Sequence, residues 1–168
     1  MTLALVASAR LKSIGAPEVE FRAVGPVGLK IDGHSPQLSA SERDGKLTIV
    51  APLTNLKTGI SLRDRHLREH LDTAKYPDAR LTVERSKLTM PADNKTVTGS
   101  AVGQFTMHGV TRPERFRYRA LRTGSDYHVQ GLTQLDIRDF SVKVPCYLGV
   151  CVRPTVKIKV KFKLREMQ

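Results

Sequence analysis

The chain has 168 residues, 40% of them hydrophobic and 26% charged, as expected of a globular chain with its own core, and we treat residues 1–168 as a single domain. No apolar run approaches the roughly 20 residues of a membrane-spanning helix, which excludes such a helix from these residues. The 28 basic and 16 acidic residues give a formal charge of +12, which favours acidic partners, but the 5% of aromatic residues argues against a protein that stacks nucleic-acid bases.

Apolar residues at every second position predict strands near the N-terminus. Residues 3–12 and residues 18–24 both alternate in this way, so we expect two strands there. Gly25-Pro26 interrupts the alternation and Leu29 resumes it on the inward face, which predicts a bulge or bend within one long strand. Residues 33–36 read Gly-His-Ser-Pro, a composition typical of a turn.

Residues 58–77 depart from strand alternation. Side chains recur there at the three- and four-residue spacing of one helix face: Leu62, His66, Leu67, His70 and Leu71. We expect Ser61 to cap this helix, with Asp64 in its first turn near the positive end of the helix dipole. Tyr76-Pro77 should return the chain to extended geometry, because proline disfavours helix at the residue before it.

Strand alternation returns after Pro77 in five runs: residues 79–90, 97–108, 115–121, 127–137 and 156–164. The first run changes phase near Ser86, which predicts a bulge or a small turn. In the second run Gly99 and Gly103 point inward, and residues this small are expected to leave room inside the fold. Residues 109–113 are predicted to turn the chain between two strands.

The number and spacing of these alternating runs predict an all-β fold. A hairpin turn at Asp44-Gly45 adds a further pair of strands, so the chain holds about eight antiparallel strands at hairpin spacing. This pattern favours an up-and-down β-barrel over a sandwich. We expect the single short helix to cap one end of the barrel.

Several short motifs, in order and at similar spacing, resemble the YceI-like family of polyisoprenoid-binding periplasmic proteins. The motifs are Thr58-Gly59, Arg63-Asp64, His66-Leu67, Tyr76-Pro77, the run from His108 to Pro113, and Arg138-Asp139-Phe140 with Tyr147-Leu148-Gly149-Val150 behind it. The resemblance runs from about Leu5 to the C-terminus. It implies a lipocalin-like antiparallel barrel around a long apolar cavity that holds an isoprenoid chain such as a quinone tail. It also implies transport, a role in stress response, no enzymatic cofactor, and a periplasmic or secreted location, with a cytoplasmic location as the alternative.

The inward strand positions supply the expected lumen of the barrel. These residues are candidates for contact with the bound lipid: Phe21, Ile49, Leu81, Phe105, Met107, Phe116, Tyr118, Val129, Leu135, Ile158, Val160 and Phe162. Each CH₂ group buried against such a surface contributes about 0.8 kcal/mol, so a long chain needs no polar contact to bind. We therefore expect binding and release without catalysis.

Polar residues near the helix are candidates for a head-group or cap site: Arg63, Asp64, His66, Arg138 and Asp139. The alternative is structural, with Asp64 satisfying the helix N-terminus and the Arg138-Asp139 pair holding a loop. His66 and His70 have a spacing that can chelate a metal, but Leu67 occupies the place of the glutamate in the zincin motif, so we predict no metal site.

Cys146 and Cys151 are five residues apart, which places them on opposite faces of a straight strand. A disulfide between them requires a turn at Gly149. From the sequence, bonded and free cysteines remain as alternatives. Outward Lys157 to Lys163 and Arg115 to Arg119 form a basic surface, interpreted as a solvated wall or as a dock for an anionic membrane. A basic interaction protein without a lumen ligand, a nucleic-acid binder, a lipid enzyme and a homodimer remain as alternatives.

Overall fold

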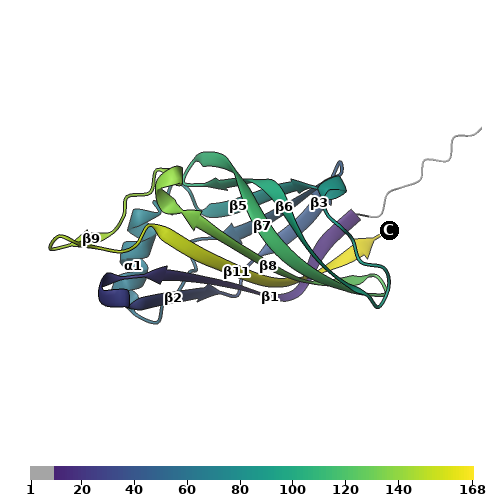
Figure 1. Ribbon diagram of the computed structural model, residues 1–168, viewed down its shortest axis with the longest axis horizontal. Coiled ribbons are helices and arrows are strands. Elements are labelled where there is room, and N and C mark those ends of the chain that lie inside the picture. Colours follow the sequence, from purple (N-terminus) through teal and green to yellow (C-terminus); the bar gives the residue numbers. More distant parts are fainter. Residues whose placement is uncertain (1–9) are drawn as a thin grey trace, which may run out of the picture.

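A computed structural model describes residues 10–168, apart from the side chain of Tyr147 (Figure 1). The longer strands of the described chain are β1 (Arg10–Val24), β2 (Lys30–Ser35), β3 (Ser39–Arg43), β4 (Lys46–Pro52), β5 (Asp78–Glu84), β6 (Thr96–Met107), β7 (Val110–Thr123), β8 (Asp126–Asp136) and β11 (Thr155–Met167). The shorter elements are the two-residue strands β9 (Cys146–Tyr147) and β10 (Val150–Cys151), the helix α1 (Ser61–His70) and the 3₁₀ turns η1 (Pro26–Gly28), η2 (Arg85–Lys87) and η3 (Ile137–Phe140).

Eight antiparallel strands form a closed barrel. Neighbouring strands follow the order β11, β8, β7, β6, β5, β4, β3 and β1, and β1 pairs with β11 to close the ring. Figure 1 shows α1 at one end of this elongated barrel and the C-terminus at the other. The prediction of an all-β antiparallel barrel with one helix at its end is confirmed.

Strand β1 is the longest strand and holds the ring together. One edge pairs with β11 from Arg10, opposite Met167, to Arg22, opposite Lys157. The other edge pairs first with β3 and then with β2, which extends the sheet beyond the ring. The register shifts between Ile14 and Glu18, so a bulge joins what the sequence presents as two strands. Residues 3–9 of the predicted first strand lie outside the described residues.

The chain between β1 and β2 turns where a bend was predicted. Val24 pairs with Lys30, so η1 is the turn of an antiparallel hairpin rather than a bulge in one strand. Leu29 is 55% exposed, and its predicted inward position is wrong. Gly33, predicted to turn the chain, lies within β2 opposite Phe21, whose ring occupies the space that a side chain at Gly33 would need.

Helix α1 starts differently from the sequence prediction. Ile60 is the N-cap residue, and Ser61 is the first helical residue with no capping hydrogen bond. Asp64 instead accepts hydrogen bonds from the backbone N and the Oγ1 of Thr58, both at 2.7 Å, which fixes the turn into the helix. These hydrogen bonds hold the pKa of Asp64 below its ordinary value.

The turns between the later strands also differ in part from expectation. The 3₁₀ turn η2 confirms the predicted small turn near Ser86. Between β6 and β7 the chain reverses at His108 and Gly109, with φ values of 53° and 74°, and β7 has already begun at Val110. Pro113 therefore lies within a strand, and the predicted turn over residues 109–113 is wrong in extent.

The end of the barrel opposite α1 is filled. Leu11 and Tyr127 are 1% exposed, and the Tyr127 hydroxyl donates to Glu166 Oε1 at 2.6 Å. Burial, with this hydrogen bond, raises the pKa of Tyr127 to about 12. Arg85 extends the network, because it pairs with the buried Glu42 at 2.9 Å and with Glu166 at 3.6 Å.

The inward glycines of β6 are covered by neighbouring side chains. A side chain at Gly99 would meet the Tyr118 ring, and one at Gly103 would meet Leu81 Cδ1 at 2.7 Å and the backbone oxygen of Thr82 at 2.9 Å. The room that these glycines were predicted to leave is therefore taken up by Tyr118 and Leu81.

Gly103→Ala should destabilise the barrel by about 1–3 kcal/mol, because the added Cβ overpacks against a backbone atom that cannot rotate away. The urea midpoint of the purified variant measures this loss. Ser100→Ala, at an exposed position of the same strand, is the matched control and should keep the wild-type midpoint. Equal midpoints for both variants would contradict the close packing of Leu81 over β6.

Candidate ligand-binding site

An apolar cavity of about 250 Å³ occupies the half of the barrel that α1 covers. Its wall comes from the inward faces of the strands, from α1 and from the segment after η3. The structure places all twelve of the predicted lumen residues on this wall: Phe21, Ile49, Leu81, Phe105, Met107, Phe116, Tyr118, Val129, Leu135, Ile158, Val160 and Phe162. Contact of these residues with a ligand stays a prediction.

Inward side chains midway along the barrel are partly exposed to the cavity, which lies between two buried clusters, one toward each end of the barrel. Ile49, Val129 and Val160 face the inside of the closed ring, yet they are only partly buried. At the opposite end the inward Tyr127 and Leu164 are 1% and 3% exposed. Medium-sized side chains on opposite walls do not meet across a ring of this width, and the unfilled space is the cavity.

Aromatic side chains form the floor of the cavity. Phe116 and Tyr118 alternate on β7 with ring centroids 6.1 Å apart, and both belong to the filled half of the core. The Tyr118 hydroxyl accepts a hydrogen bond from the backbone N of Thr89 at 2.7 Å, so its polar atom is satisfied. These rings separate the cavity from the filled end of the barrel.

The α1 end supplies the remaining wall. Leu67, His70 and Leu71 reach the cavity from the helix and its C-terminus, and Val152 and Arg153 reach it from the segment before β11. The backbone N of Arg153 donates to the oxygen of Val24 at 2.8 Å, which fastens this segment to the end of β1.

A buried aromatic residue anchors the loop beside this end. Phe140 of η3 is 0% exposed and packs edge-on against Phe105, with 5.4 Å between centroids. Its backbone oxygen lies 3.1 Å from His108 Nδ1, and His108 is in the turn between β6 and β7. The loop is thus held to both β6 and the β6–β7 turn.

Glu114 is a site residue that the sequence analysis missed. It lies on β7 in phase with Phe116, Tyr118 and Ala120, lines the cavity, and is partly buried. Burial, reinforced by the charge of Asp139 and opposed by Arg112, raises its pKa above the ordinary 4.5. Extending the alternation of the predicted strand back by one residue from Arg115 would have found it.

The five residues predicted as a head-group or cap site do not line the cavity. Asp64 is bonded to Thr58, and His66 is exposed. Arg138 pairs with Asp136 at 2.6 Å, and Asp139 accepts a hydrogen bond from Arg112 through its backbone oxygen. Arg63 is partly buried on the first turn of α1. A head-group role for these residues stays a prediction.

The histidine pair of α1 is split between two environments, since His70 lines the cavity while His66 is exposed. Among residues 10–168, no group of three or more His, Cys, Asp or Glu side chains is arranged to hold a metal ion. Within the same residues, no helix has both the length and the apolar character needed to cross a bilayer.

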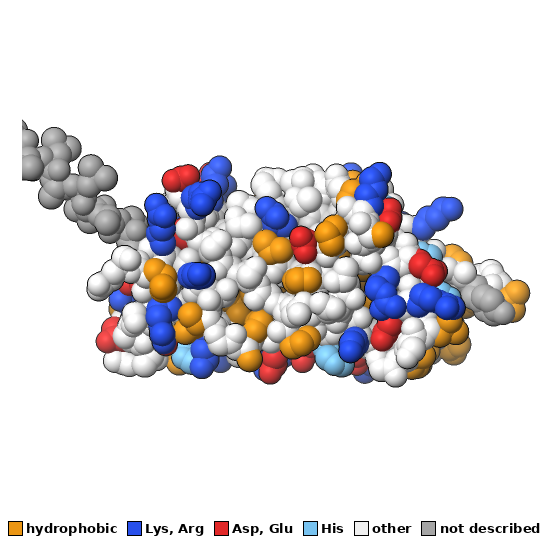
Figure 2. Space-filling view, turned by 180° about the vertical axis from the view of Figure 1, so that it is seen from behind, with side chains coloured by type: hydrophobic (Ala, Val, Ile, Leu, Met, Phe, Trp, Pro, Cys, Tyr) orange, Lys and Arg blue, Asp and Glu red, His pale blue; other side chains and the backbone are white. Residues whose placement is uncertain are grey.

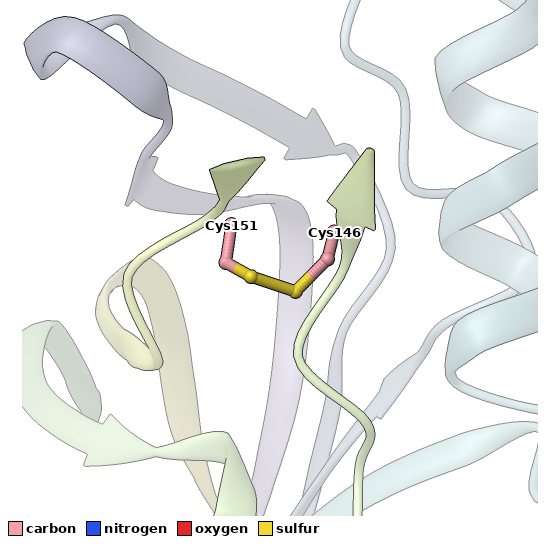
Figure 3. The surroundings of a disulfide bond; sticks show 2 residues. All are labelled: Cys146 and Cys151. Atoms are coloured by element: carbon pink, nitrogen blue, oxygen red, sulfur yellow. A yellow bond between two sulfur atoms is a disulfide. The ribbon is translucent and has the colours of Figure 1, made fainter. Parts of the chain in front are cut away.

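Cys146 and Cys151 form a disulfide across the hairpin of β9 and β10 (Figure 3). The two cysteines are direct cross-strand partners, because Leu148 and Gly149 turn the chain with φ values of 49° and 78°. This is the turn that the five-residue separation requires. The bond closes the base of a hairpin that projects from the α1 end of the barrel (Figure 1).

Known proteins share sequence or architecture with this chain. A UPF0312 protein of Pseudomonas putida is 30% identical over 122 residues, which are 68% of this chain and 61% of that protein, so the match spans about three fifths of the relative. A polyisoprenoid-binding domain from Saccharophagus degradans has the same fold, with a TM-score of 0.78 and 18% identity over 95% of this chain and 99% of the domain. Burkholderia cenocepacia BcnA is similar, with a TM-score of 0.69 and 14% identity over 88% of this chain and 95% of BcnA.

The family model for the YceI-like domain matches residues 17–164, nearly the whole barrel from β1 to β11. The chain belongs to the YceI-like family.

Proposed function

We propose that the protein binds a long apolar isoprenoid-type lipid, a polyprenyl chain or a quinone tail, and carries or sequesters it without covalent chemistry. The observation that carries this proposal is the hollow, apolar half of the barrel. The name of the Saccharophagus degradans domain, which describes polyisoprenoid binding, supports the same class of ligand.

The size of the cavity limits how the lipid can sit. Pockets for drug-sized ligands usually span about 300–1,000 Å³, and this cavity, at about 250 Å³, holds only part of a long chain. Burial of about a dozen CH₂ groups would contribute about 10 kcal/mol before ordering costs. We therefore expect one segment of the chain to lie inside and the remainder to leave through the α1 end.

The polar residues of the wall favour a head group at that end. Glu114, His70 and Arg153 line the cavity, whereas Phe116, Tyr118 and Phe162 form its apolar floor. A polar head group is costly to bury without a hydrogen-bond partner, so it should remain near these three side chains or in water.

The disulfide supports an oxidising location. Disulfides persist in the periplasm and outside the cell and are rare in the cytosol. With Cys146 and Cys151 bonded, we propose a periplasmic or secreted site of action, and transport or storage of lipid during stress as its physiological setting.

Organic extraction and mass spectrometry of the purified protein should release an isoprenoid-type lipid. The matched pair Ala51→Phe and Val50→Phe tests where it binds, because Ala51 lines the cavity while Val50 is its neighbour on the outward face of β4. Ala51→Phe should weaken binding of the dye anilinonaphthalene sulfonate by about tenfold or more, and Val50→Phe should leave it unchanged. Absence of both extracted lipid and dye binding in the wild type would overturn the proposal.

Glu114→Gln should raise stability at neutral pH relative to the wild type. A carboxyl group with a raised pKa holds its proton longer in the folded state, so wild-type stability falls as pH rises from 4.5 through the folded-state pKa. Glutamine removes this loss, and the stability difference should grow as pH rises from about 4.5 through the folded-state pKa. Urea unfolding of both proteins across this range measures it; a constant difference would contradict the environment assigned to Glu114.

A further inference from the structure

Apolar side chains gather on three loop tips at the α1 end. Of the ten large hydrophobic residues exposed within the described chain, six lie on the β1–β2 turn, at the start of α1 and on the β9–β10 hairpin: Val27, Leu29, Ile60, Leu62, Leu148 and Val150. Figure 1 shows these three segments at one end of the barrel, and Figure 2 shows hydrophobic side chains at the tip and lower edge of that end. The other four lie on the long strands of the barrel.

Two of the tips hold an apolar residue in an unfavourable backbone conformation. Val27 and Leu148 have φ values of 57° and 49°, in the left-handed region where asparagine and glycine are the usual occupants. Their side chains are 108% and 85% exposed, so packing within the protein does not compensate for the free-energy cost of this backbone conformation. A β-branched valine is especially rare at positive φ.

The same three segments are basic. Residues 24–31, 57–70 and 141–154 contain seven Lys or Arg residues and two acidic residues, Asp64 and Glu69. Asp64 is engaged by Thr58, and Glu69 lies 3.9 Å from Arg65. Apolar tips on segments with more basic than acidic residues match a bilayer that contains anionic lipid, where the tips enter the interface and the cations meet the head groups.

The basic barrel wall matches such a surface less well. On the outer face Lys159 lies opposite Glu20 and Lys161 opposite Glu18, while Arg22 is paired with Asp32. Acidic neighbours therefore offset part of this wall. The projecting segments of the α1 end contain two acidic residues, fewer than the three just named on the barrel wall. This end also carries the exposed apolar tips.

We propose that the α1 end of the barrel docks onto membranes that contain anionic lipid, with Val27, Leu148 and their neighbours inserted among the head groups. Ala23, Leu67 and Val152 line the cavity and come from β1, α1 and the segment after β10. Docking thus brings this end of the cavity against the bilayer, which would let a lipid chain pass without crossing water. That benefit rests on the proposed function, whereas docking itself does not.

Co-sedimentation of the full chain with vesicles tests the proposal. Vesicles of phosphatidylcholine with roughly one third phosphatidylglycerol should bind the protein, pure phosphatidylcholine should bind it weakly, and about 1 M salt should weaken the binding to anionic vesicles. The test variant is Val27→Asn with Leu148→Asn, because asparagine tolerates positive φ and the fold should be retained. We expect its partition coefficient to fall by about tenfold or more.

Two controls make the result specific. Val102→Thr with Leu121→Thr removes one exposed valine and one exposed leucine from the barrel wall and should bind vesicles like the wild type. Replacement of Lys157, Lys159, Lys161 and Lys163 by Gln should also have little effect.

Three outcomes would each overturn docking through the α1 end. They are wild-type binding that does not depend on anionic lipid, an unchanged partition coefficient for the Asn variant, and loss of binding only in the Lys variant. Docking by a protein that yields no extracted lipid and binds no dye would uphold this inference and refute the proposed function.

Discussion

The fixed width of an eight-stranded ring is the constraint on which the rest of the structure depends. Pairing of β1 with β11 closes the sheet, so inward side chains must fill a space of set diameter or leave it empty. Tyr118 and Tyr127 are large enough to fill the half away from α1, where they belong to one buried cluster. Ile49, Ala51 and Val160 pack against this cluster but are only partly buried, and they line the cavity that remains between it and α1.

The two ends of the barrel consequently differ in character. The filled end is held by the hydrogen bond from Tyr127 to Glu166 and by ion pairs of Arg85 with Glu42 and Glu166, and these contacts connect β3, β8 and β11. The α1 end is built from a helix, a disulfide-bonded hairpin and turns whose apolar residues face outward. A stable closed base and an end made of loops suit a protein that takes up and releases a ligand at one side.

Much of this fold follows from the alternation of apolar residues. A period of two assigns the inward face of each strand, and it was sufficient to place twelve residues around the cavity. Contacts between distant segments could not be obtained in this way. Gly33 has the composition of a turn but serves to receive the ring of Phe21, and the space beside Gly99 is filled by Tyr118 from another strand. Glu114 was missed because Pro113 suggested a turn where the strand continues.

A crystal structure of the protein loaded with a long-chain prenol tests the central claim most directly. The account predicts continuous tubular electron density inside the α1 half of the barrel, ending at the rings of Phe116 and Tyr118 and leaving the barrel beside Leu67. Inward side chains that meet across this half, with no density between them, would contradict it.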